Sequence, residues 1–417
     1  MPERTDEAAA MIEGRDIVCV TFGAWDDMVE TPQQLMTRLA ERNRVLFVDQ
    51  PVAPLDFLHG MRTPGAMARK INQWRKGLRH VSENIWVGEP PPVLPLRTNP
   101  VSNRVNTAVL RRWLSRQVRQ LGFNDPIYWS FQPWFPNLSR DIDASLRVYY
   151  CVDDFAAAPY WWNPKSGVRV REAQCCREAD IVICTGRKLV EARKEINPNT
   201  HFIAEGADVD LFATALAPET AVPAEIAALP GKVIGYAGLI NWRIDVDLMV
   251  YLAERHPEWS FALIGPVKED ENLARLTGLP NVHLFGRKTV PELPPYLKAM
   301  DVCLIPYVLN DYTHHIFPLK LYEYMAAGKP IVSTDMAEMR AYEGEEMAIG
   351  RSHEDFHDKV VEALAHDSPD RAAARRRTAA QHSWEHRIEE ISALLELALA
   401  SRGGAVAPEA GLQEATG

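Results

Sequence analysis

The sequence PLKLYEYMAAGKPIVST (residues 318–334) predicts a short helix that leads into a buried strand. Pro318 suits the first turn of a helix, residues 319–327 continue it, and Gly328 ends it, because glycine adopts the left-handed conformation that closes many helices. The apolar run after Gly328 is typical of a strand buried on both faces. A helix followed at once by such a strand is one step of a parallel α/β sheet.

The same alternation extends outward from this segment to most of the chain. Apolar runs of strand length recur at helix-sized spacing, and they form two groups. The runs are DIVCVTF (16–22), RVLFVDQP (44–51), PIYWSF (126–131), LRVYYCVDD (146–154) and ADIVICT (179–185), then KVIGYAG (232–238), WSFALIGPV (259–267), NVHLFGR (281–287), DVCLIPY (301–307) and KPIVST (329–334). We therefore predict the α/β class, with two doubly wound parallel sheets.

Chain length agrees with two domains, since 417 residues exceed the roughly 250–300 at which a single core stops growing. A stretch rich in Ala and Pro, residues 216–231, is typical of a linker. The predicted parts are a disordered N-terminus (1–15), an N-terminal domain (16–215), this linker, a C-terminal domain (232–382), a C-terminal helix (383–402) and a disordered tail (403–417).

Composition excludes several classes of protein. Hydrophobic residues make up 47% and charged residues 24%, and no run of about 18 apolar residues could span a bilayer. The first fifteen residues do not fit a secretory signal, and the six cysteines lie mostly in apolar runs, so we predict buried thiols in a cytoplasmic protein. The adjacent pair Cys175 and Cys176 leaves a redox role open. HExxH, GxSxG, GxGxxG and Cys/His metal spacings are absent, so neither a metal nor a cofactor is expected.

Lys320 and Glu323 carry the strongest chemical signal. They lie three residues apart and therefore share one face near the start of the predicted helix. Lys320 and the helix N-terminus suit a diphosphate, and Glu323 suits the two ribose hydroxyls of a nucleotide. Gly238, at the carboxyl end of its strand, would let the backbone approach the same ligand. The alternative is an ordinary surface ion pair.

Residues 318–334 resemble the donor-site segment of the retaining GT-B glycosyltransferases related to family 4 (group 1). KVIGYAG, WSFALIGPV, LPNVHLFGRK and MDVCLIPY resemble the strands of their second domain, while EADIVICTGRKL, EGADVDLF and HSWEHR add further agreement. The resemblance covers most of residues 232–400 and, more loosely, 16–212. It implies two Rossmann-like domains facing a cleft, with the C-terminal helix crossing back to the first domain.

The family's roles carry over residue by residue. Glu323 matches the glutamate that holds the nucleotide ribose, and Pro318 and Leu319 complete that segment. His315 stands where the family has its first glutamate, which leaves retention or inversion open and makes His315 a candidate catalytic residue. Leu239 replaces the usual phosphate-binding arginine, so we expect Arg243 to act with Lys320. The alternative for Arg243 is pairing with Asp245 or Asp247.

Two loops after N-terminal strands supply candidates for the acceptor side. TFGAWDDMVETPQQL places Gly23, Trp25 and Asp27 as acceptor-binding residues and Asp26 as a catalytic candidate. VDDF places Asp153 in the same position after a later strand, where a carboxylate can act as a base. The alternative for both loops is helix or loop capping.

The net charge of −10 argues against nucleic-acid binding, but residues 60–121 carry twelve basic residues against two acidic ones. INQWRKGLRHV and VLRRWLSRQVRQL interleave these charges with apolar residues, as in segments that lie on anionic membranes. This predicts a peripheral association at the inner face of the membrane. The alternatives are a solvated helix face and a docking surface for an acidic protein.

These observations predict a hexosyltransferase that uses a nucleotide sugar, with UDP expected, and a saccharide or lipid-linked acceptor in polysaccharide or glycoconjugate biosynthesis. Two alternatives remain at this point. One is a nucleotide-sugar epimerase of the same fold, and the other is a non-catalytic partner subunit, which His315 and Leu239 at family positions would suit.

Overall fold

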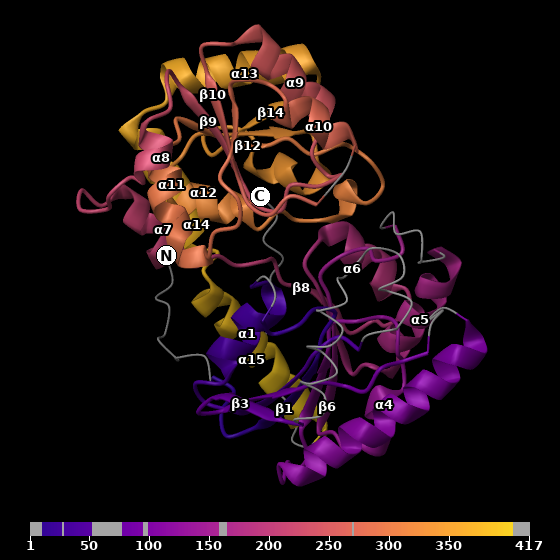
Figure 1. Ribbon diagram of the computed structural model, residues 1–417. Coiled ribbons are helices and arrows are strands. Elements are labelled where there is room, and N and C mark those ends of the chain that lie inside the picture. The colour runs from indigo at the N-terminus through magenta and orange to yellow at the C-terminus, as the bar shows by residue number, and fades with distance from the viewer. Residues whose placement is uncertain are drawn as a thin grey trace. The chain divides into compact units, whose positions relative to one another are not determined.

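The computed structural model describes residues 11–26, 29–51, 77–94, 99–157, 165–268 and 271–402, and the chain divides into two compact units (Figure 1). Unit 1 comprises Met1–Cys184, Leu189–Ile203 and Ile388–Gly417, and unit 2 comprises Thr185–Lys188 and Ala204–Arg387. Both are α/β, as predicted from the alternation of strand and helix signals.

Unit 1 is built on a sheet that has eight strands among the described residues, in the order β3-β4-β2-β1-β5-β6-β7-β8. Every neighbouring pair is parallel except β3 and β4. The strands are β1 (Asp16–Val20), β2 (Arg44–Val48), β3 (Arg79–Ser82), β4 (Ile85–Gly88), β5 (Ile127–Ser130), β6 (Leu146–Cys151), β7 (Ile181–Cys184) and β8 (Thr200–Phe202). Its helices are α1 (Thr31–Leu39), α4 (Pro100–Gln120), η1 (Leu138–Asp141), α5 (Lys165–Glu178) and, from Leu189 onward, α6 (Arg187–Lys194).

The hairpin of β3 and β4 was not predicted. Arg79, His80 and Val81 end the stretch INQWRKGLRHV, which the sequence suggested to be a cationic amphipathic segment, but they form an edge strand instead. Residues 71–76 of that stretch lie outside the described residues. β4 comes from the apolar run IWVG, which is mostly buried and pairs in parallel with β2. β3 pairs antiparallel with β4 and forms the edge of the sheet.

Unit 2 has a parallel sheet with six strands in its described part, in the order β11-β10-β9-β12-β13-β14. The strands are β9 (Val233–Ala237), β10 (Ser260–Ile264), β11 (Val282–Leu284), β12 (Val302–Ile305), β13 (Ile331–Thr334) and β14 (Ala348–Gly350). Its helices are α7 (Val209–Ala213), η2 (Thr214–Leu216), α8 (Ala224–Ala227), α9 (Val246–Arg255), α10 (Glu271–Thr277), η3 (Val290–Glu292), α11 (Leu293–Ala299), η4 (Thr313–His315), α12 (Lys320–Ala326), η5 (Ala337–Tyr342), α13 (His353–His366) and α14 (Pro369–Ala380). β14 is an addition to the five strands predicted.

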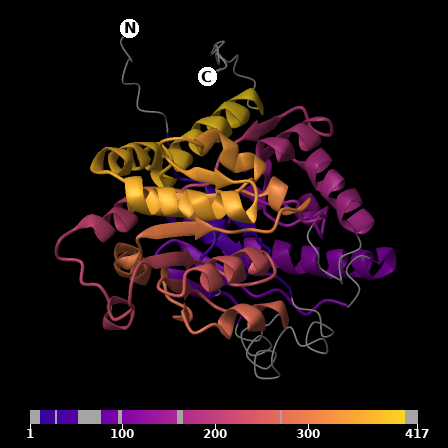
Figure 2. The same ribbon diagram turned by 90° about the horizontal axis from the view of Figure 1, so that it is seen from above.

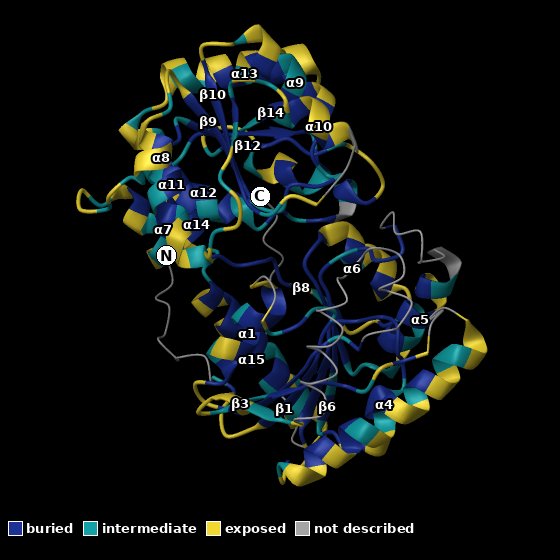
Figure 3. Ribbon diagram, in the orientation of Figure 1, coloured by how far each residue is buried: buried dark blue, intermediate teal, exposed yellow. Residues whose placement is uncertain are grey.

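Burial follows the layered arrangement of both units. In Figure 3 the strands at the centre of each sheet are dark blue, and exposed residues gather on the outer faces of the helices. β9, β10 and β12 are buried along their whole length. Strands buried on both faces must be continuously apolar, which is why these runs were recognisable in the sequence.

The Ala- and Pro-rich residues 216–231, expected to be a linker, pack within unit 2. Ile226 is buried, Glu225 accepts a hydrogen bond from Tyr296 and pairs with Lys288, and Lys298 donates to the Ala217 carbonyl oxygen at 2.6 Å. The division between the units falls before Ala204, upstream of this segment.

The C-terminal helix α15 (Trp384–Arg402) begins in unit 2 and belongs to unit 1 from Ile388 onward. This agrees with the predicted crossing back. In unit 2, Trp384 packs on Gly206, where a Cβ atom would lie 2.9 Å from the indole ring. In unit 1, Arg402 donates to the Ser145 carbonyl oxygen at 2.7 Å and pairs with Asp180.

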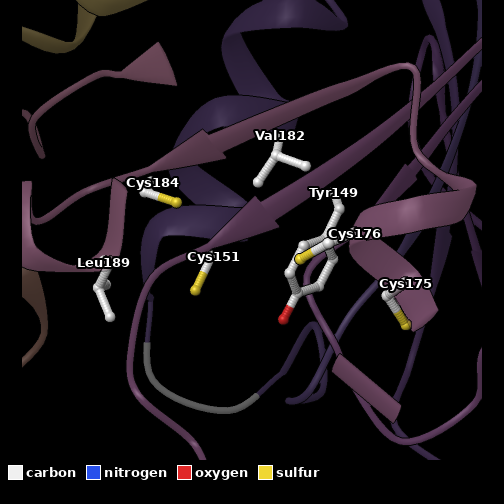
Figure 4. Packing of buried hydrophobic residues seen from close by; sticks show 7 residues of the cluster. All are labelled: Tyr149, Cys151, Cys175, Cys176, Val182, Cys184 and Leu189. Carbon is white, nitrogen blue, oxygen red and sulfur yellow. The ribbon is translucent and has the colours of Figure 1, made fainter. Parts of the chain in front are cut away.

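All six cysteines are buried and none forms a disulfide. Figure 4 shows four of them in the core of unit 1 beside β6 and β7, together with Tyr149, Val182 and Leu189. Burial raises the pKa of the Cys175 and Cys176 thiols, so both are protonated at neutral pH. The prediction of buried thiols is confirmed, and these two show none of the features of a redox pair.

Candidate functional site

The carboxyl ends of β9 and β12 meet around the side chain of Lys320 in unit 2. Its Nζ donates a hydrogen bond to the Tyr307 hydroxyl at 2.6 Å and lies 4.9 Å from the centre of that ring and 5.2 Å from that of Tyr236. Gly238 makes room for this arrangement. Its φ is 144°, and a Cβ atom there would lie 3.1 Å from Lys320 Cε. Glycine is therefore needed both for the backbone conformation and for the space that the lysine occupies.

Arg243 lies on the other side of Tyr307. Its guanidinium carbon is 5.8 Å from the centre of the tyrosine ring, and its backbone carbonyl accepts a hydrogen bond from Val308 N. The two acids proposed as alternative partners have other roles: Asp245 caps α9 by accepting from Leu248 N, and Asp247 pairs with Arg275 at 2.8 Å. Arg243 and Lys320 thus place two cations next to one phenol.

The Tyr307 phenol is perturbed by these neighbours. Burial raises its pKa, but Lys320 and Arg243 stabilise the phenolate by their charge and Lys320 by its hydrogen bond, so the pKa of Tyr307 falls to about 8. Sequence reasoning missed Tyr307, because a tyrosine that ends an apolar run is usually a core residue. The signal that could have found it is its place at a strand's carboxyl end.

Glu323 lies half-buried in the first turn of α12. Among the described residues its carboxylate has no hydrogen-bond or ion-pair partner, so the surface ion pair with Lys320 that the spacing allowed does not form. Burial raises the pKa of Glu323 to about 7, although the charge of Lys320 partly opposes this. A half-buried carboxylate without donors is a costly arrangement that a ligand bearing hydroxyl groups would relieve.

The helix itself is shorter than predicted. It was expected over residues 319–327 but spans Lys320–Ala326, with Pro318 buried and Leu319 at its N-cap. A seven-residue helix aligns few peptide dipoles, so the positive charge at this site comes mainly from Lys320 and Arg243 rather than from the helix end.

The loop between β12 and α12 is held by its own side chains. Asn310 Oδ1 accepts from Tyr312 N at 2.9 Å and Thr313 N at 3.0 Å, and Thr313 Oγ1 donates to the Val308 carbonyl oxygen. Tyr312 and Thr313 are buried. These contacts make Asn310 and Thr313 structural, while His315 ends the short helix η4 and its side chain lies outside the described part of the structure.

The residues predicted for the acceptor side lie in unit 1. Asp26 is exposed and pairs with Arg79 at 3.0 Å. Gly23 and Trp25 follow the carboxyl end of β1 and contact the residues that follow β2: Trp25 N donates to Asp49 Oδ1, and the Gly23 carbonyl oxygen accepts from Gln50 N. Asp27 lies outside the described residues.

Asp153 is half-buried after β6, and its carbonyl oxygen accepts from Phe155 N. The loop capping considered for this acidic pair is performed by its neighbour Asp154, whose Oδ1 accepts from Ala156 N and Ala157 N. Asp154 also lies 3.9 Å from Arg193, which forms a buried ion pair with Glu172 at 2.9 Å. This buried network fixes the exit of β6, and no sequence pattern indicated it.

The described segments contain no group of three or more His, Cys, Asp or Glu side chains placed to hold a metal ion. None of their helices is both long enough and apolar enough to cross a membrane.

Two doubly wound units, with Lys320, Arg243 and Glu323 at the carboxyl edge of the second sheet, define the class of GT-B proteins. Solved structures agree. Sucrose-phosphate synthase from Thermosynechococcus elongatus has a TM-score of 0.68 at 16% identity, covering 93% of this chain and 100% of that chain. HepE from Anabaena, in complex with UDP, has a TM-score of 0.61 at 13% identity over 92% and 100%. WaaG, a glycosyltransferase of lipopolysaccharide biosynthesis, has a TM-score of 0.60 at 13% identity over 90% and 98%.

Sequence comparison is more specific. Residues 231–366 match the model of the family described as Glycosyl transferases group 1. The chain is also 29% identical over 231 residues to a protein of Bacillus subtilis (strain 168) named as the teichuronic acid biosynthesis glycosyltransferase TuaH. The aligned region covers 50% of this chain and 55% of that protein. The chain thus aligns with about half the length of this relative. The predicted resemblance to group 1 glycosyltransferases and the GT-B fold are confirmed.

Proposed function

We propose that this protein transfers a hexose from a nucleoside diphosphate sugar, with UDP as the nucleotide, to a saccharide or lipid-linked acceptor. The observation that carries the proposal is the half-buried Glu323 carboxylate, which has no hydrogen-bond or ion-pair partner among the described residues. It lies one helical turn from a lysine that sits beside a glycine-lined strand end. A carboxylate suits the vicinal hydroxyls of a ribose, and a cation suits the attached diphosphate.

In this proposal the site acts mainly by positioning and by charge. Glu323 accepts hydrogen bonds from the ribose, while Lys320 and Arg243 neutralise the negative charge that grows on the departing diphosphate. Lys320 donates to the neutral Tyr307 hydroxyl in the free protein, so exchanging that contact for a phosphate oxygen gains a charge-assisted hydrogen bond. Removal of one such group typically lowers turnover by about 10²- to 10³-fold.

The relatives support the nucleotide and the kind of acceptor. HepE was solved with UDP, and a trehalose-6-phosphate protein of E. coli with the same fold was solved with UDP-2-fluoro glucose. The teichuronic acid pathway in the name of TuaH supports a polysaccharide or glycoconjugate acceptor. Gly23, Trp25, Asp26 and Asp153 remain our candidates for contacting that acceptor, and His315 for the transferred sugar. We retain the proposals of a retaining mechanism, of no metal or other cofactor, and of peripheral membrane association.

The test is a calorimetric and thermal-shift screen of UDP, GDP, ADP and their sugar conjugates. The variants Lys320→Ala and Glu323→Ala should each weaken nucleotide binding by at least about tenfold, because each removes a charged contact of about 1.5–3 kcal/mol. Lys359 and Glu362 form an exposed i,i+3 ion pair on α13 of the same unit, so Lys359→Ala and Glu362→Ala are matched controls that should bind like the wild type.

A product assay of the purified protein, with each nucleotide sugar and with or without an acceptor, separates the competing functions. An epimerase would interconvert the nucleotide sugar without an acceptor, whereas a transferase requires one for turnover beyond slow hydrolysis. A non-catalytic subunit would show no turnover with any donor and acceptor. Wild-type affinity in both site variants would refute the donor site.

A further inference from the structure

Helix α4 presents two different faces along its 21 residues. One face packs into unit 1 through buried residues that include Leu110, Leu114 and Val118. Figures 1 and 2 show the helix, in purple, along the outer side of this unit. The opposite side consists of exposed residues spaced three or four apart, which we call the α4 outer face: Val101, Arg104, Val105, Ala108, Val109, Arg112, Arg116, Arg119 and Gln120.

The α4 outer face carries positive charge that no described residue neutralises by an ion pair. The helix contains five arginines and no acidic residue. Arg111, beside this face, pairs with Asp141 at 2.5 Å. The remaining four, Arg104, Arg112, Arg116 and Arg119, form no ion pair with any described residue. In a chain of net charge −10, such a cluster marks a surface that meets a negative partner.

The same face exposes apolar side chains that water does not favour. Val101, Val105 and Val109 are 69%, 45% and 44% exposed, and their spacing of four residues places them in one line on the helix. Trp113, one of the apolar residues that the stretch VLRRWLSRQVRQL interleaves with its charges, packs instead against Gly88, where its ring lies 3.0 Å from the ideal Cβ position. The outer face therefore combines a short apolar line with a basic end.

We propose that the α4 outer face docks this protein on an anionic lipid bilayer. The arginines would contact headgroup phosphates, and the valines would lie at the boundary between headgroups and acyl chains, as in helices that bind in the plane of a membrane. Nucleic acid is a weaker fit, because phosphate-backbone binding gains nothing from a line of exposed valines. This inference deepens the proposed function. It rests on that function only for the benefit of docking, because a lipid-linked acceptor lies in a membrane surface.

The test is co-sedimentation of the full-length protein with vesicles of phosphatidylcholine, with and without about 30% phosphatidylglycerol, at low and high salt. Binding should require the anionic lipid and weaken with salt. The double variant Arg112→Gln/Arg116→Gln should bind about 30-fold more weakly, since each arginine near the surface contributes about a fivefold factor. Val101→Ser/Val105→Ser should bind several-fold more weakly at unchanged charge.

The matched control is Arg376→Gln/Arg377→Gln on α14, which removes two exposed arginines from unit 2 and should bind vesicles like the wild type. Equal binding to neutral vesicles, wild-type binding by the α4 arginine variant, or a valine variant without effect would each overturn the proposal. If the valine variant bound vesicles like the wild type and the wild-type protein bound heparin or RNA through the α4 arginines, the face would be assigned to a polyanion instead. UDP binding measured in the same samples keeps this outcome separate from the donor site.

Discussion

Glu323 shows at the scale of one residue how a binding site lowers stability. Its pKa is about 7 in the folded protein against 4.5 for an ordinary glutamate. Between these pH values the unfolded chain releases a proton that the folded protein retains, so stability falls as pH rises from 4.5 and the loss is complete above about 7. Glu323→Gln should therefore be more stable than the wild type at pH 8, by about 1–3 kcal/mol, and equally stable near pH 4.

Denaturant unfolding at several pH values measures this difference, and UDP titration of the same variant measures its cost. We expect greater stability together with nucleotide binding weakened at least about tenfold, because an amide is a poorer partner for two hydroxyl groups than a carboxylate. The expected result is a stability gain of the variant over the wild type that is larger at pH 8 than at pH 4. An equal difference at both pH values would contradict a raised pKa of Glu323.

The ionisation of Tyr307 should set the upper limit of the pH range in which UDP binds. Burial raises its pKa, and Lys320 and Arg243 bring it down to about 8, so above pH 8 a phenolate competes with the diphosphate for Lys320. UDP affinity of the wild type should fall about tenfold by pH 9. Tyr307→Phe should remove this decrease whatever its affinity at pH 7.5, and Tyr251→Phe, on α9, should keep it. Calorimetric titration between pH 7 and 9.5 distinguishes these results, and a decrease retained in Tyr307→Phe would exclude the phenol as its cause.

The sequence predicted the charged donor residues but not their surroundings. Lys320 and Glu323 are recognisable because their spacing puts them on one helix face, whatever the rest of the fold does. Tyr307 lies 13 positions before Lys320, and only the sheet brings its hydroxyl to the lysine. In the same way, the burial that raises the pKa of Glu323 depends on packing that no local pattern describes.

At the scale of elements, the turn after β9 depends on Gly238 for two separable reasons. A φ of 144° is strained for any other residue, and a Cβ atom would lie 3.1 Å from Lys320 Cε. Gly344 has a φ of 140° with nothing within 4 Å of its ideal Cβ position, so a side chain there would meet the backbone strain but no close contact. Gly238→Ala and Gly344→Ala should each lose about 1–3 kcal/mol of stability, and only Gly238→Ala should also lose UDP affinity.

Thermal unfolding and UDP titration of both glycine variants provide the comparison. Wild-type affinity in Gly238→Ala would show that the lysine does not need its present position. Among the elements themselves, most of the apolar strands were predictable, whereas β4 and the edge strands β3, β8 and β14 were not. The three edge strands are short and carry few buried residues to reveal them.

At the scale of the whole molecule, the division into two units predicts how a nucleotide changes stability. All the proposed donor residues belong to unit 2, which extends from Ala204 to Arg387 with a short segment before it. At a concentration a hundred times its Kd, UDP should add about 2.7 kcal/mol to the stability of the unit that binds it. A protein of two units need not unfold in one step, so the gain should fall on one transition rather than on both.

Hydrogen exchange with and without UDP gives the location of that gain. Protection should increase in the turn after β9 and in α12, together with the parallel strands that support them, while α4 and β3 of unit 1 should exchange as before. The reason is that binding free energy raises the cost of only those openings that break the site. Glu323→Ala should abolish the increase, and Glu362→Ala should retain it. Protection confined to unit 1 would place the nucleotide on the other sheet and refute the donor site, even if the affinity for UDP were high.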